Sequence, residues 1–356
     1  MFSSSVLQVI TMFLLIHDKI SIAEIGDYMK CTSSQDCMEP SSCTTLNYNF
    51  ASLSENEQLM FLNTTQCAGD KTNPLICCNN FEIENELPSI ATCSKPSSDY
   101  KVTGGVDALL HDYSWMTLLE HKNLTTNMLY FNGAGSLISS RYVLTVAHVA
   151  VDHKTKKTFV LQNVHLGKYD RNKTENIDTE GNIGHPTVVV GIDKVIPHPD
   201  RDGTTNDIAL IRLSKRVFFT EFIVPVCLPS MVQKTELKDE YPLEVSAWGE
   251  GTSSTAKQKL AVPYFEHSDC QRKYDEYSEI KIKESQICAG GVGDKLEGTC
   301  QGDSGGPLMS QFDKYAIEGI VLFGDDVCAR GNSSIPFVNI NVRFYETWIN
   351  ETIAQH

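Results

Sequence analysis

Cys300-Gln301-Gly302-Asp303-Ser304-Gly305-Gly306-Pro307 is the stretch from which the fold and the chemistry of this chain can be worked out. A serine hydroxyl is a weak nucleophile near neutral pH, so it needs an adjacent base and backbone N–H groups aimed at the developing oxyanion. The glycines at positions 302, 305 and 306 let the backbone turn sharply and bring such N–H groups close. A Gly/Ser turn between two strands is the alternative, and a bare Asp-Ser-Gly would favour it. The full string favours a nucleophile loop, provided that a histidine and an aspartate precede it in suitable settings.

Both residues are found upstream. Thr145-Val146-Ala147-His148 follows an apolar, strand-like run and supplies a base. Asp207 stands at the start of the apolar run Ile208-Ala209-Leu210, where an unpaired charge is costly, so we expect this carboxylate to have a partner. The order along the chain is His, Asp, Ser, which differs from that of the subtilisins and of the α/β-hydrolases.

The three motifs together resemble those of the chymotrypsin-like serine proteases, and the similarity runs from Val102 to the C-terminal helix. The general account of the triad comes from this family, so the following roles are implied by the resemblance. His148 would take the proton of Ser304 and return it to the leaving amine, and Asp207 would hold the imidazole tautomer. The N–H groups of Gly302 and Ser304 would form the oxyanion hole. The resemblance implies a serine endopeptidase.

The sequence after Val102 is dominated by short apolar runs between turn residues, for example 136–138, 142–146, 187–190 and 208–211. Many short strands without alternating helices predict an all-β fold, and the resemblance implies two six-stranded antiparallel barrels. Two helices are expected. A capping box at Ser268-Asp269-Cys270-Gln271 opens a short one, and apolar residues at 342, 345, 348, 349 and 353 share one face of a C-terminal one.

Length and charge limit the classes of function. With 356 residues, of which 41% are hydrophobic, the chain can form two unequal domains. Its formal net charge of −15 argues against nucleic acid or an anionic membrane as a partner, since both call for basic patches.

The N-terminus predicts a secretory signal peptide over residues 1–23. Val6–Ile16 is an apolar run too short to span a membrane, and small residues follow at Ser21-Ile22-Ala23; a buried helix is the alternative. Twelve cysteines and five glycosylation sequons fit a secreted, extracellular glycoprotein. The sequons lie at Asn63, Asn123, Asn172, Asn332 and Asn350.

Six of the cysteines crowd into residues 24–78: Cys31, Cys37, Cys43, Cys67, Cys77 and Cys78. A segment this short cannot bury much core, so disulfides must hold it. Spacing alone leaves 15 pairings, and a zinc site is disfavoured because the segment has no histidine and no paired Cys-x-x-Cys. The pattern resembles the clip domain that precedes the protease domain in arthropod serine proteases. That resemblance implies the pairs Cys31–Cys77, Cys37–Cys67 and Cys43–Cys78.

Residues 79–101 are polar and acidic with scattered prolines, and we interpret them as a linker that ends in an activation segment. The junction Lys101-Val102-Thr103-Gly104-Gly105 resembles the activation site of zymogens in the same family. Cleavage after Lys101 would free the amine of Val102 to form a buried ion pair with Asp303, which acts as a switch more than as a stabiliser. An exposed Lys-Val bond of no consequence is the alternative. The protease domain would then comprise residues 102–356.

The remaining six cysteines fit the same resemblance, which implies three pairs: Cys270–Cys288, Cys300–Cys328 and Cys93–Cys227. The last pair would keep the clip domain attached after cleavage.

The residues predicted to line the substrate pocket depart from the family. Gly298 stands where relatives that cut after Lys or Arg usually carry an aspartate, and without a buried anion a substrate cation would be desolvated without compensation. Leu322 replaces a serine that normally bonds the triad aspartate, in the pocket strand that continues through Phe323 and Gly324. Phe337 replaces a typical glycine, which would point its ring into or across the pocket. We predict a shallow apolar pocket that prefers uncharged side chains, or one too blocked to work well.

Two further departures concern stability and metals. Gly133 and Val149 stand where the family has a disulfide beside the catalytic histidine, so compensation elsewhere is expected. Lys168 replaces a glutamate of the calcium-binding members, and a cation there disfavours a second one, so no calcium site is expected in that loop. No metal or other cofactor is expected at all.

The leading hypothesis is a secreted serine endopeptidase, made as a zymogen, that acts in an extracellular cascade, by resemblance an immune or developmental one. Its partners would be a protein substrate such as a downstream zymogen, an upstream protease that cuts after Lys101, and a serpin inhibitor. The alternative is a weakly active or inactive homologue that serves as a binding cofactor. Such homologues commonly lose a triad residue, whereas this chain keeps all three. A purely structural role would leave the triad and the activation site unexplained.

Overall fold

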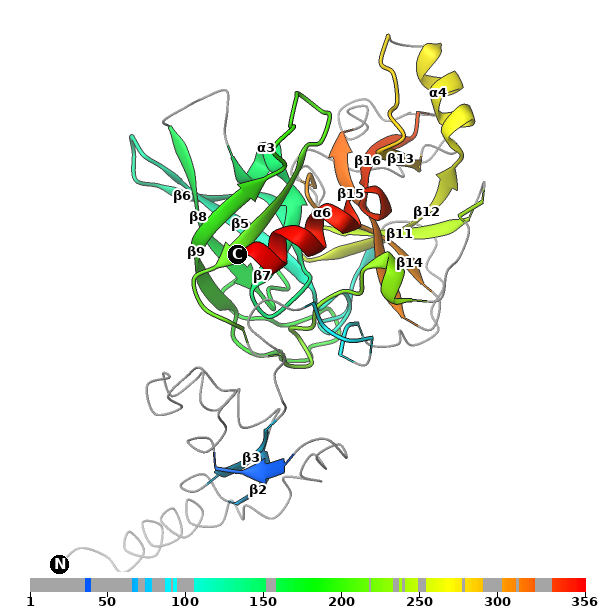
Figure 1. Cartoon of the computed structure of the whole chain (residues 1–356). Coiled ribbons are helices and arrows are strands. Elements are labelled where there is room, and N and C mark those ends of the chain that lie inside the picture. The colour runs from blue at the N-terminus through cyan, green and yellow to red at the C-terminus, as the bar shows by residue number, and fades with distance from the viewer. Residues whose placement is uncertain are drawn as a thin grey trace, which may run out of the picture. The chain divides into compact units, whose positions relative to one another are not determined.

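The computed structural model describes residues 36–39, 66–69, 74–78, 87–90, 92–94, 106–151, 158–217, 219–232, 237–238, 241–248, 254–276, 279–290, 303–311, 314–323 and 335–356. The chain divides into two units, residues 1–81 and 82–356 (Figure 1). In the part of the chain that is described, none of the helices is long and apolar enough to cross a membrane.

The first unit contains a small antiparallel sheet. Its strands are β1 (Asp36–Met38), β2 (Gln66–Gly69) and β3 (Pro74–Cys78), in the order β1-β3-β2. A disulfide joins Cys37 to Cys67 and so links the two outer strands. This is one of the three pairs that the clip-domain resemblance implies. The other two involve Cys31 and Cys43, which lie outside the described residues.

The second unit begins with a closed antiparallel barrel in the order β10-β7-β6-β5-β8-β9. Its strands are β5 (Met116–Asn123), β6 (Leu129–Leu137), β7 (Tyr142–Val146), β8 (Phe159–Leu166), β9 (Val188–Pro197) and β10 (Ile208–Leu213). Every residue of β7 is buried, and its apolar side chains fill the barrel together with those of β10. The short apolar runs of the sequence therefore form strands because closing the barrel buries them.

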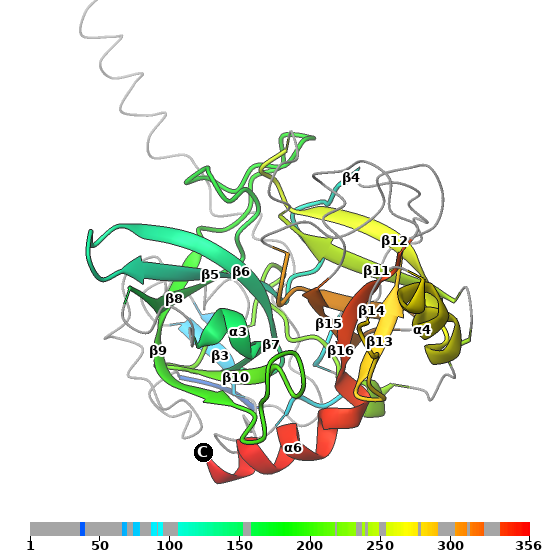
Figure 2. The same ribbon diagram turned by 90° about the horizontal axis from the view of Figure 1, so that it is seen from above.

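A second ring of six strands follows, in the order β11-β14-β15-β16-β13-β12, and a pairing between β11 and β12 closes it. Its strands are β11 (Pro242–Ala247), β12 (Gln258–Phe265), β13 (Gln286–Ala289), β14 (Pro307–Gln311), β15 (Tyr315–Phe323) and β16 (Phe337–Asn341). The short strand β4 (Val106–Asp107) pairs with β12 on the outside. Figure 2 shows the two barrels side by side. The prediction of two six-stranded antiparallel barrels is confirmed.

Among the described residues, helices are few and short except at the C-terminus: α3 (Ala147–Ala150), the 3₁₀ turn η3 (Pro229–Met231), α4 (His267–Asp275) and α6 (Val342–Gln355). The helix expected near Cys270 exists, but the capping box is wrong, because α4 begins after Glu266 and Ser268 is already its second residue. The C-terminal helix α6 buries the predicted face, with Trp348 only partly covered. It starts at the end of β16 and runs across to the first barrel (Figures 1 and 2).

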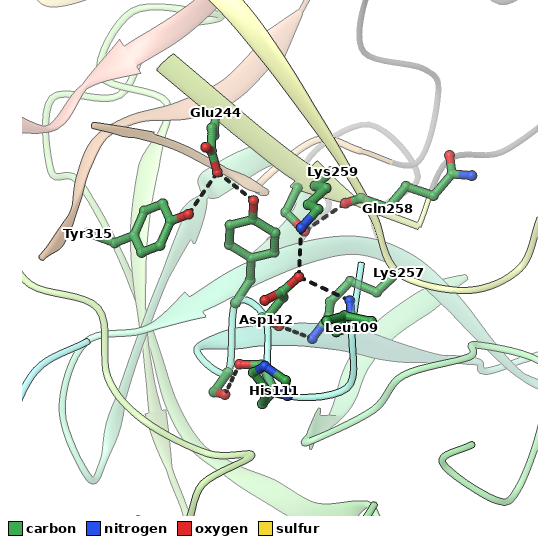
Figure 3. Close-up of polar contacts among 11 residues, drawn as sticks. Leu109, His111, Asp112, Glu244, Lys257, Gln258, Lys259 and Tyr315 are labelled. Atoms are coloured by element: carbon green, nitrogen blue, oxygen red, sulfur yellow. Dashed lines mark hydrogen bonds and ion pairs between the residues drawn. The ribbon is translucent and has the colours of Figure 1, made fainter. Parts of the chain in front are cut away.

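The segment that precedes β5 is tied to the second barrel by a buried polar network (Figure 3). The carboxylate of Asp112 accepts hydrogen bonds from the backbone N–H of Leu109 at 3.0 Å and from the ammonium of Lys259 at 2.9 Å. The backbone carbonyl of Asp112 accepts one from the ammonium of Lys257. Next to it, one oxygen of Glu244 accepts the hydroxyls of two tyrosines, Tyr113 and Tyr315. The chain is therefore fixed from β4 onward, a few residues after Val102.

Candidate active site

His148 and Asp207 meet at the ends of two paired strands. β7 and β10 are neighbours with Val146 opposite Ile208, so the residues just beyond this pair lie close together. Nδ1 of His148 lies 2.6 Å from Oδ2 of Asp207, and the backbone N–H of His148 donates to Oδ1 at 2.8 Å. The expected partner of the buried carboxylate is thus the predicted histidine. The pairing leaves Nε2 of the ring for another partner.

The burial of the two side chains differs. Asp207 is 2% exposed, whereas the side chain of His148 is 38% exposed and accessible from solvent. A second charged group reaches the carboxylate, because Nε of Arg201 lies 2.8 Å from Oδ1 of Asp207. Arg201 was not predicted from the sequence. The available signal was a cation in the short polar turn directly before Asp207, a position from which it can fold back onto the carboxylate.

The backbone around Ser304 is held between the two barrels. The carbonyl of Ser304 accepts the N–H of Ala134 from β6 at 2.9 Å, and the N–H of Gly305 donates to Val321 of β15 at 2.9 Å. Gly305 has φ +87°, and a β-carbon there would lie 2.1 Å from the carbonyl oxygen of Ala134 and 2.3 Å from Oγ1 of Thr145. Only glycine fits this position, as the nucleophile-loop interpretation requires. Gly302, the other predicted donor of the oxyanion hole, lies outside the described residues.

Gly133 connects the histidine side of the site to the serine side. It has φ +78°, and a β-carbon on it would lie 2.6 Å from Cγ1 of Val149 and 2.9 Å from the carbonyl oxygen of Ser304. Val149 follows His148 in α3, so the helix that carries the histidine and the loop that carries the serine pack against the same glycine. The site lies at the junction of the two barrels.

The contact between Gly133 and Val149 also fills the place of the missing disulfide. A further tie comes from His121 of β5, which is buried and whose Nε2 lies 2.9 Å from the carbonyl oxygen of Val149. Its Nδ1 lies 3.3 Å from the carbonyl oxygen of Leu119. Both partners are acceptors, so the ring donates, and the shorter contact favours the tautomer that carries its proton on Nε2. His121 therefore holds α3 from the barrel wall. Compensation for the missing disulfide was expected from the sequence, but its place was not.

Part of the predicted pocket is described. Leu322 is buried in β15, and Phe323 follows it, half-buried, with its ring centroid 6.5 Å from that of Tyr274. Phe337 is 3% exposed, and its ring packs against Gly290 and the core of the second barrel. Gly298 and Gly324 lie outside the described residues, so the direction of the Phe337 ring relative to the pocket stays a prediction.

The activation residues are described only in part. Asp303 is buried, which suits the expected ion pair. Lys101 and Val102 lie outside the described residues, and so does the disulfide expected between Cys300 and Cys328. The structure contains the two other pairs expected in this unit, Cys93–Cys227 and Cys270–Cys288.

Three of the five sequons fall on described residues. Asn172 and Asn350 are exposed and Asn123 is half-buried, whereas Asn63 and Asn332 lie outside the description.

The loop after β8 contains its own cation. The ammonium of Lys168 donates to the carbonyl of Lys173 inside the loop, and burial lowers the pKa of Lys168 while Asp170 opposes that shift. Elsewhere among the described residues, no cluster of three His, Cys, Asp or Glu side chains could hold a metal ion.

Comparison with known proteins gives one consistent answer. Residues 102–349 match the model of the trypsin family. The chain is 32% identical to phenoloxidase-activating factor 3 of Holotrichia diomphalia over 94% of its own length and 96% of the relative's. It is 28% identical to the CLIP domain-containing serine protease HP8 of Bombyx mori, over 92% and 93% of the two lengths. It is 30% identical to the Spaetzle-processing enzyme of Drosophila melanogaster, over 95% and 94%. The chain therefore belongs to the trypsin family of serine endopeptidases, among the clip-domain serine proteases of arthropods.

Proposed function

We propose that this chain is a secreted zymogen, that cleavage after Lys101 converts it into an active serine endopeptidase, and that it acts in an extracellular proteolytic cascade. One observation carries the proposal. A buried carboxylate, Asp207, holds Nδ1 of an accessible histidine, His148, at 2.6 Å, beside a loop whose backbone fits only glycine after Ser304.

In the proposed mechanism, Asp207 keeps the proton of the His148 ring on Nδ1, so Nε2 can accept the proton of the Ser304 hydroxyl. The serine oxygen attacks the peptide carbonyl, and the N–H groups of Gly302 and Ser304 stabilise the oxyanion. His148 then donates its proton to the leaving amine as the C–N bond breaks. A water molecule, deprotonated by the same histidine, hydrolyses the acyl-enzyme and regenerates Ser304.

The anchored segment before β5 supports an activation switch in which only a few residues move. Because the polar network fixes the chain from β4 onward, cleavage after Lys101 would release only the few residues from Val102 to that strand. The new ammonium would move to Asp303, which is buried next to Ser304, and order the oxyanion hole.

The proposed substrate is a protein cut after an uncharged residue. Gly298 offers no anion for a lysine or arginine side chain, and the large apolar side chains of Leu322 and Phe337 would reduce the space in the pocket. A panel of peptides that differ only at the residue before the scissile bond tests this proposal. A strong preference for arginine or lysine would contradict it.

The names of the relatives support a place in a cascade. One is called a phenoloxidase-activating factor and another a Spaetzle-processing enzyme, so each is named for an action on another protein. We propose a downstream zymogen as substrate, an upstream protease that cuts after Lys101, and a serpin as inhibitor. Neither nucleic acid nor membrane is a proposed partner.

A second candidate function is that of a binding cofactor with little or no proteolytic activity. The observation in its favour is the buried ring of Phe337 at a position where the family usually has glycine. If this ring fills the pocket, the triad has no substrate side chain to orient, and binding by the two units would remain as the function.

Labelling with a fluorophosphonate distinguishes the two candidates, because the probe reacts with an activated serine and needs no substrate side chain. The recombinant chain is cleaved at Lys101 and incubated with the probe. We expect labelling after cleavage that Ser304→Ala abolishes and that Ser230→Ala, at an exposed serine, leaves intact. A folded, cleaved protein that remains unlabelled would favour the cofactor.

A further inference from the structure

The carboxylate of Asp207 has one contact more than a triad requires. Oδ2 lies 2.6 Å from Nδ1 of His148, and Oδ1 accepts the backbone N–H of His148. The same Oδ1 lies 2.8 Å from Nε of Arg201, so one buried anion is shared by an imidazole and a guanidinium. Arg201 is only 13% exposed, and water therefore screens this ion pair weakly.

The turn between β9 and β10 fixes Arg201 in place. The backbone N–H of Arg201 donates to the carbonyl of His198 at 3.2 Å. Asn206, with φ +51°, donates from its side chain to the carbonyl of Asp200 at 2.8 Å and accepts the hydroxyl of Tyr345 from α6 at 2.6 Å. A turn tied at both ends thus holds the guanidinium against the triad carboxylate.

The sequence gives Asp207 one side-chain donor fewer than the family resemblance implies. Leu322 stands where the family resemblance places a serine that bonds the aspartate, and it is buried without a polar group in its side chain. A buried carboxylate that loses a donor is destabilised unless another group compensates its charge. We propose that Arg201 is a positioning residue of the triad, which balances the buried charge of Asp207 and holds this carboxylate in place against His148.

This proposal rests on the proposed function and deepens it. A guanidinium beside Asp207 holds the carboxylate strongly, since opposite charges attract across a weakly screened site. The carboxylate can then keep its orientation toward Nδ1 of His148. Other titratable groups near the pair are His198 and Asp200 on the same turn and Tyr345 on α6.

The test is the NMR spectrum of the full-length chain with isotope-labelled histidine, read at the ring N–H proton that His148 donates to Asp207. This signal is assigned by its loss in His148→Gln. It is expected to shift and broaden in Arg201→Gln, because the carboxylate that accepts the proton is no longer held in one position. Arg201→Lys retains the charge and is expected to stay near the wild type. The readout does not require activity, so it stands even if the protein is not labelled by a fluorophosphonate.

The matched control is Arg212→Gln, which removes an arginine of similar burial that pairs with Asp193 on the barrel wall. It is expected to leave the His148 signal unchanged, and His198→Asn checks that His198 is not mistaken for it. If Arg201→Gln does not fold, Arg201→Met keeps the apolar stem and serves instead. An unchanged His148 signal in the folded neutral variant would overturn the proposal. In the cleaved, labelling-competent enzyme, the rate of labelling is expected to fall in Arg201→Gln and to recover in Arg201→Lys.

Discussion

The side chain of Val149 lies against the α-carbon of Gly133, where it leaves no room for a β-carbon. A β-carbon on Gly133 would lie 2.6 Å from Cγ1 of Val149 and 2.9 Å from the carbonyl oxygen of Ser304. Glycine is therefore required there for space as well as for its φ of +78°. A packing contact between positions 133 and 149 thus stands where the family has a disulfide, and the same glycine also lies against the nucleophile loop.

Gly133→Ala is expected to destabilise the second unit by more than its backbone conformation alone would explain. The matched control is Gly181→Ala, because Gly181 has φ +85° and nothing within 4 Å of the added carbon. The control should cost about 1–2 kcal/mol for the left-handed conformation. Urea unfolding of both variants measures the difference, and fluorophosphonate labelling should fall in Gly133→Ala alone. Equal stability losses would show that the contact with Val149 contributes nothing.

His121 is expected to stabilise the helix that carries His148. His121→Ala removes the donor to the carbonyl of Val149 and leaves a buried acceptor unpaired, at a cost of about 1–3 kcal/mol. His121→Gln retains an N–H donor and should recover part of the stability and of the labelling rate. His111, an exposed histidine, is the control position. Loss of stability in His111→Ala of the same size would contradict the assignment, and differential scanning calorimetry provides the comparison.

The triad motifs were predictable because each lies in a local setting that reveals it. Asp207 could be expected to have a partner because a charge at the start of a buried strand needs one, and His148 could be expected as the base because it closely follows an apolar, strand-like run. The many short apolar runs predicted an all-β barrel fold and the family resemblance implied two barrels, whereas the closure between β11 and β12 is a pairing that no single run reveals.

Arg201 and His121 were not predictable in the same way. Arg201 reaches Asp207 because the turn that contains it folds back. A hydrogen bond between Asn206 and Tyr345 holds that turn, and these two residues are far apart in the sequence. His121 reaches Val149 across the barrel wall. The capping box at Ser268 failed because the start of α4 is set by the strand before it and not by the local cap. Contacts made by long-range packing leave little trace in a local pattern.

The disulfide Cys93–Cys227 should hold the two fragments together after cleavage at Lys101. It joins a residue N-terminal to Lys101 to the protease domain, so cleavage there should not release the N-terminal fragment. On a denaturing gel we expect one band without reductant and two with it. Cys93→Ser together with Cys227→Ser should give two bands under both conditions. A fragment released from the wild type without reductant would contradict this arrangement.

Lys257 should give the stability of the second unit a specific dependence on pH. It is buried, and burial lowers its pKa from 10.5 to about 8, while Asp112 opposes the shift and Lys259 adds to it. Between pH 8 and 10.5 the unfolded chain holds a proton on this amine that the folded chain has lost. Stability therefore rises with pH across this interval, and below pH 8 the full cost of the buried charge is present.

Lys257→Met removes this titration. The free energy of unfolding of the wild type relative to Lys257→Met should increase from pH 8 to 10.5 by up to about 3 kcal/mol. Lys259→Met is the matched control, since it removes a neighbouring lysine that bonds the same Asp112 and leaves Lys257 in place. Urea unfolding across the interval measures all three proteins. A difference between wild type and Lys257→Met that stays constant with pH would mean that Lys257 remains charged in the folded protein, held by Asp112 despite its burial.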